Sequence, residues 1–217
     1  MFVDENVQID LGAAVLEADL AIPSEAIGVV VFVHGSGSDR QSPRNRQVAE
    51  TLLRDSLGTA LVDLLTAEED ELDRVTRQVR FDIPLLAERT TAIVDWLTAE
   101  PRTADEPVGL FGASTGAAAA LIAAANRPDA VRAVVSRGGR VDLAEAALPQ
   151  VVAPTLLVVG EHDAPVLEIN QRLQPQIATS RLDVVPGATH LFEEPGALDQ
   201  VAEAAGAWFA RHLPGHR

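Results

Sequence analysis

The chain has 217 residues, of which 47% are hydrophobic, and its 32 acidic and 17 basic residues give a net charge of −15. This length and apolar share predict a single domain spanning residues 1–217, and the negative charge argues against a nucleic-acid partner, which requires a concentrated positive surface. The absence of cysteine and lysine excludes disulfides, a cysteine nucleophile, a Schiff-base lysine and a P-loop.

The predicted elements alternate between strands and helices from residue 27 onward. Residues 7–11 and 13–20 are expected to pair as an antiparallel hairpin, and residues 27–35 form a valine-rich apolar run typical of a strand covered on both faces. Further strands are predicted at 58–65, 107–112, 131–136, 154–163 and 180–187, and helices at 43–56, 82–100, 115–126, 166–177 and 197–213. Asp82 is expected to cap the second of these helices. The pattern predicts an α/β fold with a mostly parallel, doubly wound sheet after the hairpin.

The acidic N-terminal segment MFVDENVQID lacks the basic and apolar regions of a signal peptide, and no apolar run has the length of a membrane span. We therefore expect a cytoplasmic protein with no membrane partner. The sequence indicates no cofactor and no metal site, and it gives no oligomeric state.

The segment GASTG matches the G-x-S-x-G pattern of a nucleophile elbow, with a predicted strand before it and a predicted helix after it. Such a turn is so sharp that side chains two residues before and after the serine would clash, and Gly112 and Gly116 leave that space open. The sequence therefore predicts Ser114 as a catalytic nucleophile. A serine hydroxyl is a poor nucleophile at neutral pH, so a base and an acid should accompany it.

In elbow enzymes the acid and the histidine follow the serine in the chain. Asp163, at the end of a predicted strand, and His190, after the last strand, fit this order. For the acid, the competing residues are Glu161 and Asp142, although Asp142 is expected to cap a short helix. For the base, the competing residues are His162, His212 and His216.

The transition state also needs hydrogen-bond donors for its oxyanion. The backbone N–H of Thr115 is expected to be one donor. The second is expected from the segment HGSGS, with Ser36 favoured and Gly37 next, while His34 is interpreted as a structural residue.

The segments HGSGS, GASTG, GEHD and GATHLF together resemble the α/β-hydrolases, and among them the small lidless enzymes of the dienelactone hydrolase type. The resemblance covers about residues 27–213 and implies hydrolysis of an ester or lactone through an acyl-enzyme. Dienelactone hydrolases carry cysteine in the elbow, whereas this chain has Ser114, which favours a serine carboxylesterase acting on a small-molecule ester.

The surroundings of the predicted site are expected to be open, because the segment between residues 136 and 154 is too short for a cap domain. Short-chain esters are therefore the expected substrates. Arg137 and Arg140 follow a strand on the active edge and are candidates for binding a substrate carboxylate, with Arg44 a weaker one. An ion pair with an acidic residue is the favoured alternative for both. The acidic run at 67–73 is expected to be a solvated loop.

Two other functions remain open. A dinucleotide-binding oxidoreductase would use the glycines of HGSGS and Asp63 as the ribose-binding acid, although Arg40 stands at the third glycine position. A non-catalytic, hydrolase-like binding protein would keep the triad residues without their geometry.

Overall fold

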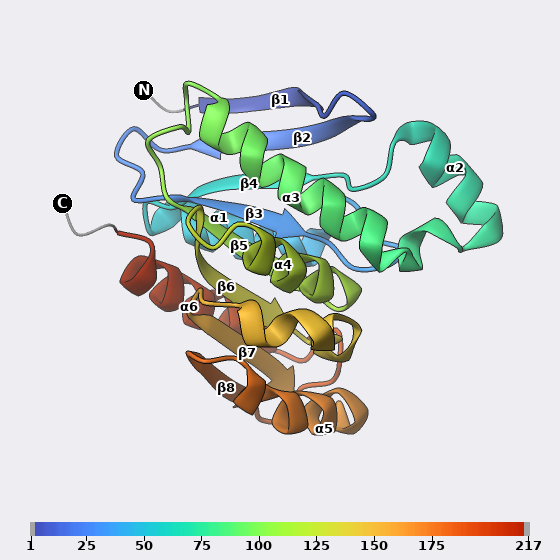
Figure 1. The fold of residues 1–217 in the computed structure, drawn as a ribbon. Coiled ribbons are helices and arrows are strands. Elements are labelled where there is room, and N and C mark those ends of the chain that lie inside the picture. Colours follow the sequence, from blue (N-terminus) through green and yellow to red (C-terminus); the bar gives the residue numbers. More distant parts are fainter. Residues whose placement is uncertain (1–2, 215–217) are drawn as a thin grey trace.

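One mixed sheet forms the centre of the molecule (Figure 1). The structure is a computed structural model that describes residues 3–214. Within them, eight strands pair in the order β1-β2-β4-β3-β5-β6-β7-β8, with β1 and β2 antiparallel to their neighbours and all the others parallel. Their bounds are β1 Val3–Asp10, β2 Val15–Ile22, β3 Val29–Val33, β4 Gly58–Val62, β5 Val108–Ala113, β6 Val131–Arg137, β7 Thr155–Gly160 and β8 Ser180–Val185.

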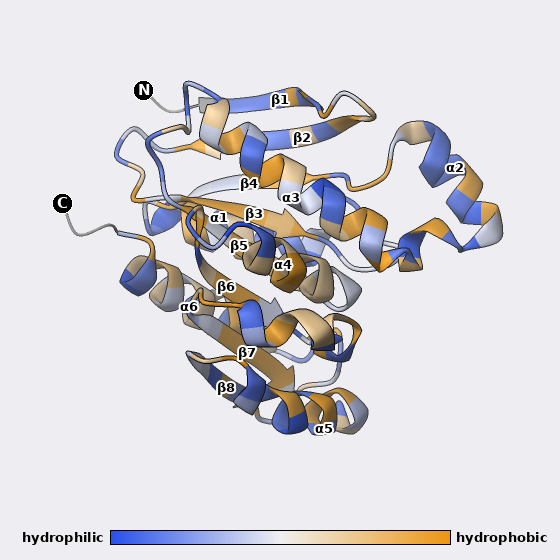
Figure 2. Ribbon diagram, in the orientation of Figure 1, coloured by the Kyte–Doolittle hydropathy of each residue, from blue (hydrophilic) through white to orange (hydrophobic). Residues whose placement is uncertain are grey.

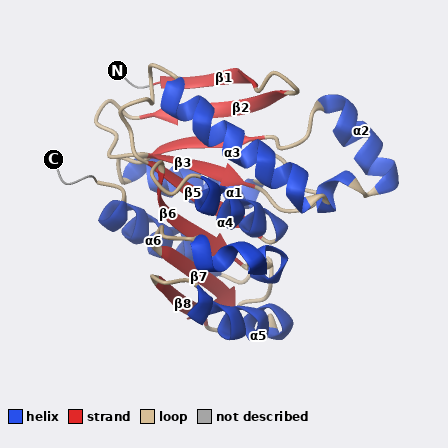
Figure 3. Ribbon diagram, in the orientation of Figure 1, coloured by secondary structure: helices blue, strands red, loops and turns tan. Residues whose placement is uncertain are grey.

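Helices cover both faces of this sheet (Figure 3). On one face the core contains residues of α3, α4 and α5, and on the other it contains residues of α1 and α6. The central strands β3, β4 and β5 are buried along their whole length, which explains their continuous apolar runs. The α-helices are α1 Pro43–Arg54, α2 Ala67–Thr76, α3 Ile83–Ala99, α4 Thr115–Asn126, α5 Ala164–Leu173 and α6 Ala197–His212, and the 3-10 helices are η1 Val79–Phe81, η2 Val141–Gln150 and η3 Gln174–Gln176.

This arrangement confirms the predicted α/β-hydrolase fold, including the antiparallel hairpin at its start. The predicted cap of α3 is also present, since the Asp82 side chain accepts the N–H of Leu85 at 3.1 Å. The link between β6 and β7 consists mainly of η2, which packs against α4 and α5. No helix in residues 3–214 is long and apolar enough to cross a membrane.

Two local predictions were wrong. The acidic segment expected as a loop forms α2, a mostly hydrophilic helix that projects beyond the body of the molecule (Figure 2). Thr66 and Glu69 close a capping box at its start, so reciprocal hydrogen bonds satisfy the first N–H groups. Asp142 does not cap a helix, because it lies inside η2 and pairs with Arg140.

Candidate active site

Ser114 lies at a sharp turn between β5 and α4. Its φ of +51° is in a region that side-chain-bearing residues seldom adopt. A Cβ on Gly116 would lie 2.2 Å from the Val33 carbonyl oxygen, and one on Gly112 would lie 2.4 Å from the Ala117 Cα. Both contacts are too short for any side chain, so the two glycines allow the elbow to form.

Two backbone hydrogen bonds hold this strained residue. The Ser114 N–H donates to the Arg137 carbonyl at 3.0 Å, and the Ser114 carbonyl accepts the N–H of Arg140 at 3.0 Å. The turn is therefore hydrogen-bonded both to the last residue of β6 and to the loop that follows this strand. This support fixes the direction in which the serine side chain leaves the sheet edge.

A continuous chain of hydrogen bonds joins Ser114, His190 and Asp163. His190 Nδ1 lies 2.6 Å from Asp163 Oδ2, and His190 Nε2 lies 3.2 Å from Ser114 Oγ. With the carboxylate accepting, Nδ1 carries the proton and Nε2 is free to accept the serine proton. The Asp163 side chain is 11% exposed and that of His190 is 39% exposed, so the acid is sheltered while the imidazole reaches the surface.

Glycines also bring the histidine loop into place. A Cβ on Gly160 would lie 2.4 Å from the Ala188 carbonyl oxygen, so the end of β7 passes directly beside the loop that carries His190. Gly138 has a φ of +56°, and its Cβ position lies 3.4 Å from the His190 ring. Small residues from two neighbouring strand ends therefore leave room for the imidazole.

The competing acids have other partners. Glu161 accepts the N–H of Gly187 at 2.7 Å, and Asp142 forms a bidentate pair with Arg140. Among the competing histidines, His162 lies on the exposed turn beside Asp163. His212 lies in α6 with its ring 4.4 Å from that of Trp208, and His216 falls outside the described residues.

The predicted oxyanion loop lies against the elbow. A Cβ on Gly35 would come within 3.1 Å of the Ser114 Cβ. The Ser36 N–H donates to the Thr115 hydroxyl at 2.9 Å, and Thr115 is 4% exposed. The N–H of Ser36, which was the favoured second donor, is thus already engaged by the Thr115 hydroxyl, a contact that the sequence did not predict and that leaves Gly37 as the candidate for this role. Gly37 follows with a φ of +72°.

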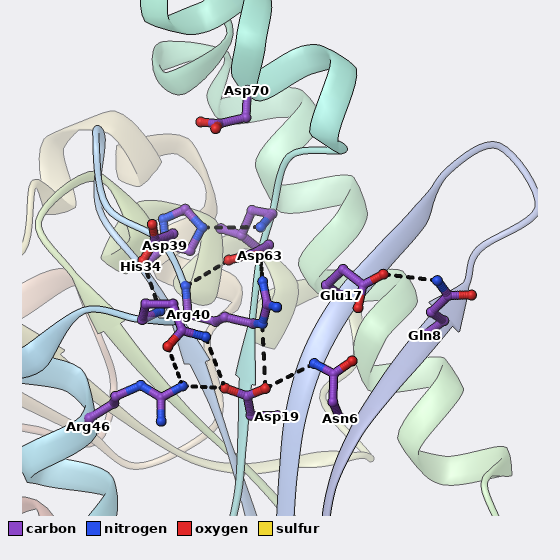
Figure 4. Close-up of polar contacts among 12 residues, drawn as sticks. Asn6, Gln8, Glu17, Asp19, His34, Asp39, Arg40, Arg46, Asp63 and Asp70 are labelled. Atoms are coloured by element: carbon purple, nitrogen blue, oxygen red, sulfur yellow. Dashed lines mark hydrogen bonds and ion pairs between the residues drawn. The ribbon is translucent and has the colours of Figure 1, made fainter.

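A network of charged residues anchors the rest of this loop (Figure 4). The Arg40 N–H donates to Asp63 at 2.7 Å, its guanidinium also pairs with Asp63, and its Nε lies 3.4 Å from Asp19. Arg46 of α1 pairs with the same Asp19. Asp63, the residue considered for binding a ribose, is therefore already engaged by Arg40.

His34 has the structural role that was expected. Its Nε2 accepts the N–H of Leu64 at 3.1 Å, and its Nδ1 donates to the Gly35 carbonyl at 3.0 Å. Burial lowers the pKa of His34, which favours the neutral ring that these two bonds require. The histidine thereby joins the ends of β3 and β4 beneath the oxyanion loop.

The two arginines at and just after the end of β6 differ in their partners. Arg140 pairs with Asp142 at 2.8 and 2.7 Å, as the favoured alternative predicted. Arg137 is 8% exposed, and no side-chain ion pair or hydrogen bond is formed by it within residues 3–214. The expected ion pair was therefore wrong for Arg137. Burial, and then the positive charge of Arg44, lower the pKa of Arg137 to about 10.

Comparison with known proteins adds the family. The solved structure of a dienelactone hydrolase from Anabaena variabilis is 54% identical, with a TM-score of 0.96 and coverage of 98% of this chain and 99% of that one. Est1E from Butyrivibrio proteoclasticus shares the fold at 18% identity, with a TM-score of 0.79 over 95% of this chain and 98% of its own.

A curated relative from Mycobacterium tuberculosis, named a putative phosphoribosyl transferase, is 55% identical over 213 residues. The match covers 98% of this chain and 47% of the relative, so the chain spans about half the length of the curated relatives it matches. The model of the dienelactone hydrolase family matches residues 16–213, and the chain therefore belongs to the dienelactone hydrolase family.

Proposed function

We propose that this member of a hydrolase family is a serine carboxylesterase that cleaves small esters through an acyl-enzyme on Ser114. The observation that carries the proposal is the hydrogen-bonded series Asp163–His190–Ser114, with the serine in a strained elbow. A lactone is an internal ester and would react by the same steps.

In the first half of the reaction, Ser114 Oγ attacks the ester carbonyl carbon while His190 Nε2 accepts the serine proton. Asp163 keeps Nδ1 protonated and stabilises the imidazolium that forms. The oxyanion that forms from the carbonyl oxygen accepts hydrogen bonds from the N–H of Thr115 and from the N–H of Gly37, because the Ser36 N–H is already donated to the Thr115 hydroxyl. The C–O bond to the alcohol then breaks, and the alcohol leaves with the proton from His190.

In the second half, His190 accepts a proton from water as the water oxygen attacks the acyl carbon. The bond to Ser114 Oγ breaks, the serine recovers its proton from the imidazolium, and the carboxylic acid leaves. Bond making and proton transfer balance over the two halves without any cofactor.

Short acyl groups are the expected substrates. The β6–β7 link packs against α4 and α5, and only 4% of residues are aromatic, which limits an apolar wall over a long acyl chain. Each buried methylene contributes about 0.8 kcal/mol, so an acyl tunnel would make kcat/KM rise steadily with chain length. We expect kcat/KM to level off between acetate and butyrate.

The test is a series of 4-nitrophenyl esters of increasing chain length, assayed with the wild type and Ser114→Ala. A fluorophosphonate probe should label Ser114 in the wild type, and peptide mapping would locate the adduct. Full activity of Ser114→Ala, or labelling at another residue, would contradict the nucleophile assignment. A kcat/KM that keeps rising to the dodecanoate would contradict the open site.

The alternatives predict different results. A non-catalytic binding protein would hydrolyse no ester and would not be labelled. A dinucleotide-binding oxidoreductase would bind a nicotinamide cofactor, with Asp63 released from Arg40. The name of the Mycobacterium tuberculosis relative describes a protein of which only 47% is matched, so we do not extend phosphoribosyl transfer to this chain.

A further inference from the structure

Asn170 is a polar residue at a buried position of α5. The residues that α5 buries are Val166, Asn170 and Leu173, which recur at the spacing of one helix face. Asn170 is 0% exposed, so its amide is removed from water in the middle of an otherwise apolar stripe. A buried amide is costly unless it is hydrogen-bonded, and the bonds of this side chain therefore indicate why an asparagine occupies the position.

The Asn170 amide joins α5 to the loop that follows β6. Its Nδ2 donates to the Gly139 carbonyl at 2.9 Å and to the Val166 carbonyl at 2.8 Å. Only the NH2 end of an asparagine can donate to two carbonyl oxygens, so these two acceptors fix the orientation of the amide. The bond to Val166 stays within α5, whereas the bond to Gly139 spans 31 residues of the chain. The bond to Gly139 is therefore the tertiary contact that Asn170 supplies.

The loop that receives this bond, residues 137–140, contacts both the nucleophile and the base of the triad, and we call it the support loop. Its first carbonyl accepts the N–H of Ser114, and its last N–H donates to the Ser114 carbonyl, each at 3.0 Å. Between these two bonds, the Cβ position of Gly138 lies 3.4 Å from His190 Cε1 and Nδ1. The position of the support loop therefore sets both the serine and the imidazole.

The support loop is held between α4 and α5. A Cβ on Gly139 would lie 1.9 Å from Ser136 Oγ and 2.7 Å from the Cβ of Ala117 in α4, so the loop is closely packed on that side. On the other side, the Gly139 carbonyl accepts the bond from Asn170. Because the residues on either side of Gly139 contact the triad, a displacement of this peptide group changes the triad geometry.

Helix α5 also carries the acid. Asp163 is the N-cap residue of α5, roughly two turns before Asn170, and its carboxylate lies 2.6 Å from His190 Nδ1. One helix therefore positions the acid at its start and, through Asn170, the loop that contacts the serine and the imidazole.

We propose that Asn170 is a positioning residue for the triad, which holds the support loop against α5 so that His190 Nε2 stays within 3.2 Å of Ser114 Oγ. Asn170 acts through the loop and contacts none of the three triad side chains. This inference rests on the proposed function, because it takes the triad as the reacting centre. A displacement of about 1 Å in an active site lowers the rate by about 10²-fold, so a small shift of the loop is sufficient for a kinetic effect.

The first test is Asn170→Thr, which removes the tertiary bond with little disturbance of α5. A threonine hydroxyl in a helix donates to the carbonyl four residues earlier, here that of Val166, but the side chain is one bond too short for Gly139. We expect kcat for 4-nitrophenyl butyrate to fall roughly 10- to 100-fold, with KM within about twofold of the wild-type value, because no contact with the substrate is lost.

Thr103→Val is the matched control. Thr103 is 1% exposed and donates to the Leu97 carbonyl at 2.7 Å, so this variant also loses a buried bond from a side chain to a carbonyl oxygen. Thr103 precedes β5 whereas Ser114 follows it, which places the control at the opposite edge of the sheet. Both variants should lower the melting temperature, but Thr103→Val should keep the wild-type kcat.

The second test is Asn170→Asp, which restores a donor only while the introduced carboxyl group is protonated. The neutral group can donate its O–H to the Gly139 carbonyl, whereas the ionised group is an acceptor only and repels that oxygen. The ratio of the variant kcat to the wild-type kcat, measured at the same pH, should therefore rise as the pH falls. A ratio that does not depend on pH would overturn the positioning role, and this result decides if Asn170→Thr fails to fold.

A measurement without turnover separates this inference from the proposed function. The proton on His190 Nδ1, which is hydrogen-bonded to Asp163, has a downfield proton NMR resonance that should move in Asn170→Thr and stay in place in Thr103→Val. If the wild type hydrolyses esters and folded Asn170→Thr keeps both kcat and this resonance, the positioning role is overturned and the esterase stands. If the wild type hydrolyses no ester but the resonance moves in Asn170→Thr alone, the esterase is rejected and the positioning role is retained.

Discussion

Replacing Asp163 with asparagine tests the role of its charge with little change in shape. The amide oxygen can still accept a hydrogen bond from His190 Nδ1, which lies 2.6 Å from the carboxylate. The variant loses the negative charge that stabilises the imidazolium formed when Ser114 attacks. We therefore expect kcat to fall while KM changes little, because no contact with the substrate is removed.

The magnitude follows from the geometry. The charges of an imidazolium and a carboxylate are spread over their atoms, so their centres lie roughly 4 Å apart and interact by about 4 kcal/mol at an effective dielectric constant of 20. At about 1.36 kcal/mol per tenfold change, this corresponds to about three powers of ten in rate. The His190 side chain is 39% exposed, and solvent weakens part of the interaction, so we expect a loss of about 10²- to 10³-fold.

The assay measures kcat and KM for 4-nitrophenyl butyrate and the rate of labelling by a fluorophosphonate, which should fall in parallel because both begin with attack by Ser114. Glu161→Gln is the matched control, since this acid lies two residues earlier and binds the Gly187 N–H. An Asp163→Asn variant within fivefold of the wild type, or an equal loss in Glu161→Gln, would refute the assignment of the acid.

Three further predictions concern the supports of the site. Thr115→Val removes the hydroxyl that accepts the Ser36 N–H, so kcat should fall. Thr115→Ser keeps this hydroxyl and should keep kcat near that of the wild type, and equal kcat values for the two variants would contradict an orienting role of Thr115. Gly116→Ala places a Cβ 2.2 Å from a backbone oxygen and should lower the free energy of unfolding by at least about 2 kcal/mol in urea titrations; a stable variant would contradict the steric account. The hydrogen bond from Arg89 lowers the pKa of Glu69, so the stabilisation by Glu69 is present above its unfolded pKa of about 4.3 and is lost as pH falls through the folded pKa. Melting temperatures of the wild type and Glu69→Gln should therefore converge in acid, and a constant difference would argue against this linkage.

The order of elements and the meeting of the triad residues were predictable because both depend on local rules. A buried parallel strand reads as a continuous apolar run, and the carboxyl ends of parallel strands share one edge. Ser114, Asp163 and His190 each follow a strand that ends at that edge, and so their proximity follows from topology. The steric demand of the elbow is equally local, since it concerns glycines two residues on either side of one serine.

Helix α2 could not be predicted from hydrophobic periodicity, because only Asp73 of its residues is buried. The helix is held by polar contacts instead. Its Glu69 closes the capping box with Thr66 and also pairs with Arg89 of α3. The spacing of Thr66 and Glu69 is a local signal of a capping box, but it lies within an acidic run that is more typical of a solvated loop. The contact of Glu69 with Arg89, 20 residues away in the chain, is a tertiary contact that no local pattern contains.

The contrast between Arg137 and Arg140 has the same origin. Both lie at or just after the end of one strand, in a chain with an excess of acidic residues, so an ion pair was expected for each. Asp142, two residues from Arg140, supplies that pair locally. The environment of Arg137 depends on the packing of α1 and α6 on their face of the sheet, and the charge that acts on it there is that of Arg44 rather than that of a carboxylate.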